Sequence, residues 1–106
     1  MDKETNDALR ARIPFISPPD ALLVTRGIYI LGSEVVHKIL SRVKSFKDFN
    51  PDNDPWEKHD FGSFNYNGKK ILWKIDDCQG YEGYNLVLTV MLAKGLSLKK
   101  WVKVCG

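Results

Sequence analysis

The chain has 106 residues, of which 43% are hydrophobic and 27% charged, and it carries 16 basic against 13 acidic side chains. This length predicts one domain, residues 1–106, and the composition argues against a disordered or fibrous protein. The net charge of +3 falls short of the dense basic surface of a dedicated nucleic-acid-binding domain.

Residues 1–20 predict an N-terminal arm. Residues 5–12 suit two helical turns with Thr5 or Asn6 as the N-cap, and the prolines that begin at Pro14 prevent any continuation. Four apolar side chains are expected to hold the arm on the body of the domain: Leu9, Ile13, Phe15 and Ile16.

A short strand and an amphipathic helix follow the arm. Residues 22–25 are β-prone, and residues 28–30 are expected to extend the strand past a bulge at Gly27. Ser33 then suits the N-cap of a helix. Apolar side chains recur along this helix at spacings of three and four: Val35, Val36, Ile39, Leu40, Val43 and Phe46. The helix is therefore expected to pack on a sheet by one side.

The strongest local signal is the pair Asn67-Gly68 between two alternating apolar segments. Asn-Gly suits a two-residue hairpin turn, so residues 61–66 and 69–76 are predicted to be paired strands. The side chains expected on their shared core face are Phe64, Tyr66, Ile71, Trp73 and Ile75. Residues 86–92 predict a further buried strand, with a helix as the alternative.

Together these elements predict an α+β fold. We expect a three- or four-stranded, mainly antiparallel sheet with one long amphipathic helix packed on one face. Residues 94–106 form a basic C-terminal tail, which suits one more helical turn or an edge strand.

The ends and the cysteines bear on the compartment. Residues 1–7 are polar and no apolar leader follows them, and the apolar runs are far shorter than a bilayer requires. With only Cys78 and Cys105 in the chain, free thiols are expected. These features favour a cytoplasmic protein that does not associate with membranes.

The densest polar segment lies between the predicted helix and the hairpin. A calcium loop that starts at Asp52 fails, because Glu57 replaces the required glycine and Ser63 the bidentate glutamate. The Asn, Asp and Pro residues of 50–55 instead predict a stiff loop that presents acids and an aromatic anchor, Trp56, to a protein partner. The candidate partner-binding residues are Asp52, Asp54, Trp56, Glu57, His59 and Asp60. The alternative for Trp56 is that it folds back and closes the core.

A lysine and aromatic face is the second candidate surface, since such surfaces stack the bases of nucleic acids. Its lysines are Lys69, Lys70, Lys74, Lys99, Lys100 and Lys103, and the nearby aromatic residues are Tyr66, Trp73 and Trp101. These aromatic residues suit the core equally well.

Enzymatic chemistry has weaker support. His59 with Asp54, Asp60 and Asp76 could bind a divalent metal, or His59 could act as a general base oriented by Asp76. These acids suit turns and strand ends equally well, so we assign no catalytic residue, no metal and no cofactor.

Six segments occur in a characteristic order. They are residues 6–10 (NDALR), 22–27 (LLVTRG), 48–55 (DFNPDNDP), 59–62 (HDFG), 73–76 (WKID) and 88–93 (LTVMLA). In this order they resemble a bacterial family known as domain-of-unknown-function family 3768. The resemblance implies no activity, because none is assigned to the family. It implies a setting among plasmids, phages and other mobile elements, beside anti-restriction genes.

The residues and the resemblance together favour a small, non-enzymatic protein-binding module. From the setting we expect a mobile-element-encoded inhibitor of a bacterial defence system, either a CRISPR complex or a restriction nuclease. The alternatives are a nucleic-acid-binding accessory protein that uses the lysine and aromatic face and, third, a small His/Asp-based or metal-dependent enzyme. The sequence leaves the oligomeric state open.

Overall fold

The computed structural model describes residues 2–93 of the chain. The elements in chain order are α1 (Lys3–Ala11), β1 (Ala21–Val24), α2 (Arg26–Tyr29), α3 (Ser33–Lys44), β2 (Phe61–Tyr66), β3 (Lys69–Asp77), the 3-10 turn η1 (Tyr81–Gly83) and β4 (Leu86–Leu92). The predicted basic tail, with Lys99, Lys100 and Lys103, lies outside the described residues.

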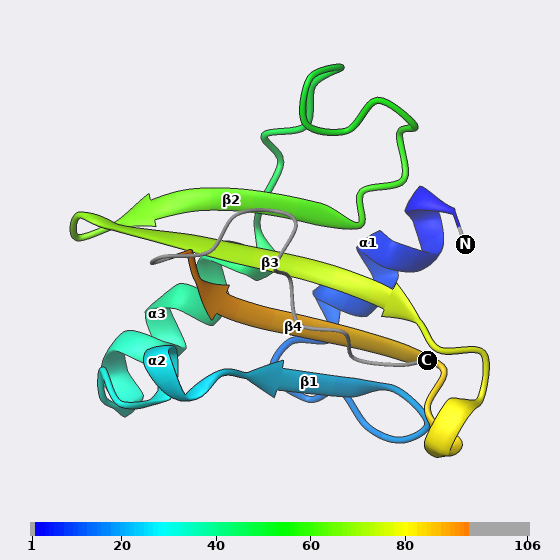
Figure 1. Cartoon of the computed structure of the whole chain (residues 1–106), viewed down its shortest axis with the longest axis horizontal. Coiled ribbons are helices and arrows are strands. Elements are labelled where there is room, and N and C mark those ends of the chain that lie inside the picture. Colours follow the sequence, from blue (N-terminus) through cyan, green and yellow to red (C-terminus); the bar gives the residue numbers. More distant parts are fainter. Residues whose placement is uncertain (1, 94–106) are drawn as a thin grey trace.

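A four-stranded sheet in the order β1-β4-β3-β2 forms the centre of a mixed α+β fold (Figure 1). β2 and β4 are antiparallel to β3, whereas β1 is parallel to β4. The predicted hairpin is confirmed, and both of its turn residues have positive φ, 48° at Asn67 and 79° at Gly68. Residues 86–92 are a strand, so the helical alternative is excluded.

The three helices pack against one face of this sheet. The core cluster joins Leu9 of α1, Ile28 of α2 and Ile39 of α3 to side chains of the two central strands, Ile71, Trp73, Ile75, Leu88 and Val90. Phe64 and Tyr66 of β2 pack against the same cluster, as the hairpin pattern predicts. The central strand β4 is buried on both faces, which explains its nearly continuous apolar run.

Within residues 2–93 the helical part is divided among three α-helices, of which α3 with 12 residues is the longest. Gly32 is the N-cap of α3 and Ser33 its first residue, so the prediction of Ser33 as N-cap is wrong. The cap of α1 also differs from the prediction. Asp2 rather than Thr5 or Asn6 is the N-cap, and its carboxylate accepts a hydrogen bond of 2.8 Å from the Thr5 amide.

The prediction that residues 28–30 extend the first strand is wrong. Thr25 ends the extended segment, and its carbonyl accepts hydrogen bonds from the amides of Ile28 and Tyr29, which start the short helix α2. Ile28 is fully buried in this conformation. Burial of one apolar side chain in the core therefore outweighs the β propensity of the segment.

Two further expectations concern the membrane and the cysteines. Among the described helices, none combines the length and the apolar character needed to cross a bilayer. Cys78 is disulfide-bonded and largely buried in the structure, so the prediction of a free thiol at this position is wrong.

Candidate functional site

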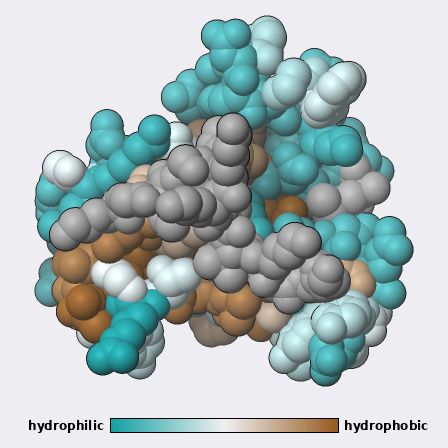
Figure 2. All heavy atoms as spheres, in the orientation of Figure 1, coloured by the Kyte–Doolittle hydropathy of each residue, from teal (hydrophilic) through white to brown (hydrophobic). Residues whose placement is uncertain are grey.

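The segment between α3 and β2 is a projecting loop whose first half is fixed by its own asparagines. The Asn50 side chain accepts hydrogen bonds from the amides of Asp52 (2.8 Å) and Asn53 (3.0 Å). In return, the side-chain Oδ1 of Asn53 accepts a hydrogen bond from the Asn50 amide, and the side-chain Nδ2 of Asn53 donates to the Asp48 carbonyl oxygen. Figure 2 shows this projection at the top of the view as a mainly hydrophilic surface. The reciprocal bonds fix the turn that the Asn and Pro content predicts.

Asp54 fixes the second half of the loop from inside. Its side chain is only 7% exposed, and it accepts hydrogen bonds from the amides of Lys58 (3.0 Å) and His59 (3.2 Å). The loop needs this support because Glu57 and His59 both have positive φ, 51° and 54°. Asp54 is thus an internal brace of the loop rather than a surface for a partner.

Trp56 lies at the exposed end of the loop. The residue is 79% exposed, which excludes the alternative that it folds back and closes the core. The neighbouring acids Asp52 and Glu57 are exposed as well, whereas Asp60 is half-buried beside the start of β2. Two of the predicted acids therefore accompany Trp56 on the surface.

His59 is held between two carboxylates. Its Nδ1 atom lies 3.0 Å from Asp7 Oδ1, and its Nε2 atom lies 3.5 Å from Asp54 Oδ2. The imidazole also stacks on Phe49, with 3.8 Å between the ring centres and 4° between the planes. Because both nitrogens face carboxylates, His59 acts as a structural link, and its orienting carboxylate is Asp7 rather than Asp60 or Asp76.

Asp7 of α1 is the centre of the charge network that anchors the loop. It accepts a 2.8 Å hydrogen bond from Arg10, which also donates to the carbonyl oxygens of Val43 and Phe46 at 3.0 Å each. Burial raises the pKa of Asp7, but hydrogen bonds and charge attraction from Arg10 and His59 outweigh this effect and hold the pKa below its ordinary value of 3.8. The carboxylate is therefore stabilised in its charged form.

Asn6 was predicted only as a possible N-cap, and neither Asp7 nor Arg10 was among the predicted site residues. The Asn6 side chain donates a 2.8 Å hydrogen bond to the Lys58 carbonyl oxygen, so two neighbouring residues of α1 hold the end of the loop. Arg10 is buried, and its guanidinium lies 4.9 Å from the Trp73 ring. The available signal was the three-residue spacing of Asp7 and Arg10, which suits an ion pair on one helix face.

The lysine and aromatic face is assembled differently from the prediction. Lys69 and Lys70 are exposed beside the hairpin turn, but the Lys74 side chain is only 13% exposed and forms an ion pair of 3.0 Å with Asp76. Trp73 is fully buried in the core and offers no ring to a nucleic-acid base.

The part of the chain that the structure describes holds no preformed metal site. Within residues 2–93, no three His, Cys, Asp or Glu side chains are placed to hold one metal ion.

Comparison with known proteins places the chain in a family. The model of DUF3768, described as a protein of unknown function, matches residues 24–82, which is more than half of the chain. Neither the curated proteins nor the solved structures contain a match. The match covers α3, the projecting loop and the hairpin, so the chain belongs to domain-of-unknown-function family 3768.

Proposed function

We propose that residues 50–58 are a protein-binding surface with Trp56 as its anchor, and that the protein is a non-enzymatic inhibitor of a bacterial defence nuclease. The observation that carries the proposal is the 79% exposure of Trp56 on a braced loop. Tryptophan is among the residues that most often dominate the binding energy of protein interfaces.

The rigidity of the loop supports this role. The reciprocal Asn50–Asn53 bonds and the Asp54 brace hold the loop in one conformation before any partner arrives. A surface that is ordered in advance loses less conformational entropy on binding. The link from Asp7 to His59 extends this support to α1.

The exposed acids suggest the chemistry of the partner. Asp52 and Glu57 flank Trp56 in the sequence, and both are exposed. Carboxylates around an aromatic anchor complement a basic surface such as the nucleic-acid channel of a nuclease. The choice of a CRISPR or restriction nuclease as the target rests on the mobile-element setting that the family resemblance implies.

The first experiment is a pull-down with the tagged full chain from nuclease-treated bacterial lysate, read by mass spectrometry. Trp56→Ala should abolish capture of one stoichiometric partner. Tyr29→Ala should leave capture unchanged, since Tyr29 is 70% exposed on α2, outside the loop. Equal capture by the two variants would contradict the assignment of the loop.

The second experiment tests inhibition. The captured nuclease is purified, and cleavage of its DNA substrate is measured with increasing amounts of the chain. Inhibition should be lost with Trp56→Ala and weakened with Asp52→Asn combined with Glu57→Gln. Undiminished cleavage in the presence of the bound wild-type chain would refute the inhibitor role and leave only binding.

Both experiments are run with and without reductant. Defence nucleases act in the cytoplasm, where disulfides are rare, whereas Cys78 is disulfide-bonded here. The hydrogen bonds that fix the loop come from α1 and from the loop itself, so binding should be the same in both conditions.

A further inference from the structure

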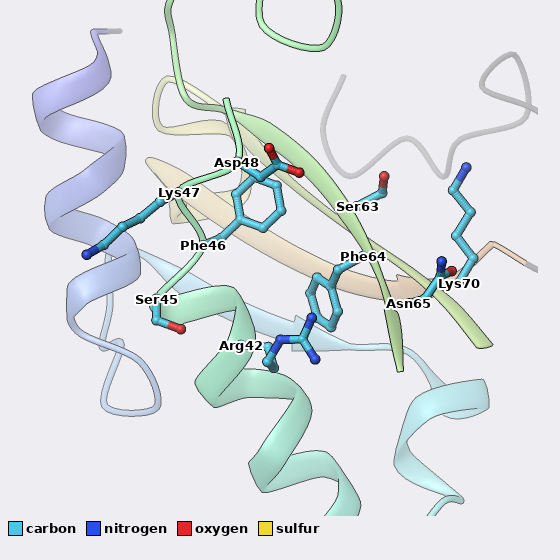
Figure 3. Close-up of a pocket in the computed structure, with 9 residues that line it drawn as sticks. All are labelled: Arg42, Ser45, Phe46, Lys47, Asp48, Ser63, Phe64, Asn65 and Lys70. Carbon is cyan, nitrogen blue, oxygen red and sulfur yellow. The ribbon is translucent and has the colours of Figure 1, made fainter. Parts of the chain in front are cut away.

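A groove of about 590 Å³ runs along β2, which is the edge strand of the sheet among the described residues, beside the C-terminal end of α3 (Figure 3). Its lining includes Arg42 from α3, Phe64 and Asn65 from β2, and Lys70 from β3. The groove contains none of residues 50–58, so it is a surface separate from the Trp56 loop.

The edge of β2 offers backbone groups to this groove. The Ile75 amide donates a 2.8 Å hydrogen bond to the Asp60 carbonyl oxygen, which fixes the hydrogen-bonded pairs of the hairpin at every second residue from Asp60. Ser63 and Asn65 lie between these pairs, so their backbone N–H and C=O groups point away from β3. Both residues line the groove.

Two cations flank this edge from opposite sides. The Arg42 guanidinium lies 4.7 Å from the centre of the Phe64 ring on the helix side of the sheet, and Lys70 lies opposite Asn65 in the hairpin register. No ion pair within residues 2–93 engages Arg42 or Lys70. Lys47 also lines the groove, but its side chain points toward α1 in Figure 3. The positive charge at the β2 edge therefore comes from Arg42 and Lys70.

We propose that the β2 edge binds an acidic peptide segment of a partner protein, which adds to the sheet as a fifth strand. The backbone of such a segment pairs with Ser63 and Asn65, as in other complexes formed by strand addition. Its alternate side chains point to the two faces of the sheet, so acids on one side meet Arg42 and acids on the other meet Lys70.

Charge decides between this partner and a second copy of the chain. Two β2 edges paired around a twofold axis would bring Arg42 and Lys70 of one copy close to the same cations of the other. Like charges brought together in this way oppose association.

One acid, Asp48, lines the loop end of the groove and disfavours an acidic residue of the peptide there. The acidic part of the peptide is thus expected at the hairpin end.

The test is a titration of the isotope-labelled full chain with the peptide acetyl-Val-Glu-Glu-Val-Glu-Glu-amide, whose neighbouring glutamates point to opposite faces of the strand, followed by amide chemical shifts. The amides of Ser63 and Asn65 should shift, with a dissociation constant of about 1 mM or tighter. The matched lysine peptide should shift them at least tenfold less. The acidic peptide with every backbone nitrogen methylated should also bind at least tenfold more weakly, because it has no N–H group left to donate to β2.

Variants separate this surface from the Trp56 loop. Arg42→Ala combined with Lys70→Ala should weaken binding of the acidic peptide about tenfold. Lys3→Ala combined with Arg26→Ala removes the same charge from exposed positions of α1 and α2 and should leave binding unchanged. Trp56→Ala should also leave binding unchanged, so this proposal and the proposed function can fail independently.

Four titration results would overturn the proposal: no shift at Ser63 and Asn65, equal binding of the lysine peptide, full binding of the methylated peptide, or stronger shifts with a thymidine octanucleotide. The last result would indicate a single-stranded nucleic-acid site instead. Sedimentation of the free chain as a dimer through this edge would also overturn it.

Discussion

Asp7 and His59 are 52 positions apart in the sequence, and the Asp7 Oδ1 and His59 Nδ1 atoms lie 3.0 Å apart in the fold. This contact joins the N-terminal helix to the end of the projecting loop. A second contact, from the Asn6 side chain to the Lys58 carbonyl oxygen, runs beside it. The position of the loop therefore depends on α1, although α1 precedes the residues 24–82 that match the family model.

Asp7→Asn should lower the free energy of unfolding by about 1 kcal/mol at pH 7, as measured by urea denaturation. The substitution keeps the shape of the side chain but weakens its charge-assisted bonds to Arg10 and His59, and Asp7 is half-exposed, so solvent screens part of the effect. Glu34→Gln is the matched control, since it removes an exposed acid that pairs with Lys38 at 3.5 Å. An equal loss of unfolding free energy for Glu34→Gln and Asp7→Asn would show that the Asp7 contacts stabilise the fold no more than an exposed ion pair does.

The same contact predicts a dependence of stability on pH. Because the pKa of Asp7 is below 3.8 in the folded chain, its stabilising contribution is complete above the unfolded value and is lost as the pH falls through the lower folded value. The difference in unfolding free energy between the wild-type chain and Asp7→Asn should therefore shrink on the acid side of pH 3.8. Urea unfolding of both proteins across the acid range measures this difference. A constant difference down to the lowest pH would refute the role given to the Asp7 charge.

Local patterns predicted the strands well because their signals are local. The Asn67-Gly68 turn sets the hairpin register, and alternation places Ile71, Trp73 and Ile75 on the core face. The strand prediction for residues 28–30 was wrong because the core contact of Ile28 determines the conformation of this segment. No local pattern reveals that contact. The parallel pairing of β1 with β4 joins segments from opposite ends of the described chain and had no local signal either.

The stiffness of the loop could be predicted from its composition, but the hydrogen bonds that support it could not. The Asn and Pro content of residues 50–55 indicated a stiff turn, and of the two alternatives left open for Trp56, the exposed one holds. Asp54 was assigned to the partner surface, yet it accepts amide hydrogen bonds inside the loop. A carboxylate that caps its own loop and one that faces a partner have the same sequence signature, so only the fold distinguishes them.

Arg10→Met should be the most destabilising substitution of a charged residue in α1, with a loss of about 3 kcal/mol in urea unfolding. Arg10 is 4% exposed, and its removal takes away the guanidinium that donates to the carbonyl oxygens of Val43 and Phe46, of which Val43 keeps a 3.3 Å hydrogen bond from the Phe46 amide. Arg12→Met is the control, because Arg12 is exposed and its bond to Asp20 is solvent-screened. We expect this control to cost under about 1 kcal/mol. Similar losses for the two variants would mean that the Arg10 bonds do not stabilise the end of α3.

Gly62→Ala should destabilise the chain by about 2 kcal/mol through crowding of the core. A Cβ atom at this position of β2 would meet the Trp73 indole, with Cε2 at 2.7 Å, and the Phe46 ring, with Cε1 at 2.8 Å. Neither ring can move easily, because Trp73 is fully buried and the two rings pack edge to face at 5.5 Å.

Gly27→Ala is the control for this substitution. Its Cβ atom would lie 3.2 Å from the flexible end of Leu92, and alanine is the better helix former at a position within α2. Thermal denaturation should therefore show a clear fall in Tm for Gly62→Ala and little change or a small rise for Gly27→Ala. Gly62→Ala should also weaken the contacts by which α1 holds the loop, since the Trp73 ring that it displaces lies against the Arg10 guanidinium. An unchanged Tm for Gly62→Ala would mean that β2 can move away from the helices, and the tight packing inferred between Gly62, Phe46 and Trp73 would then be wrong.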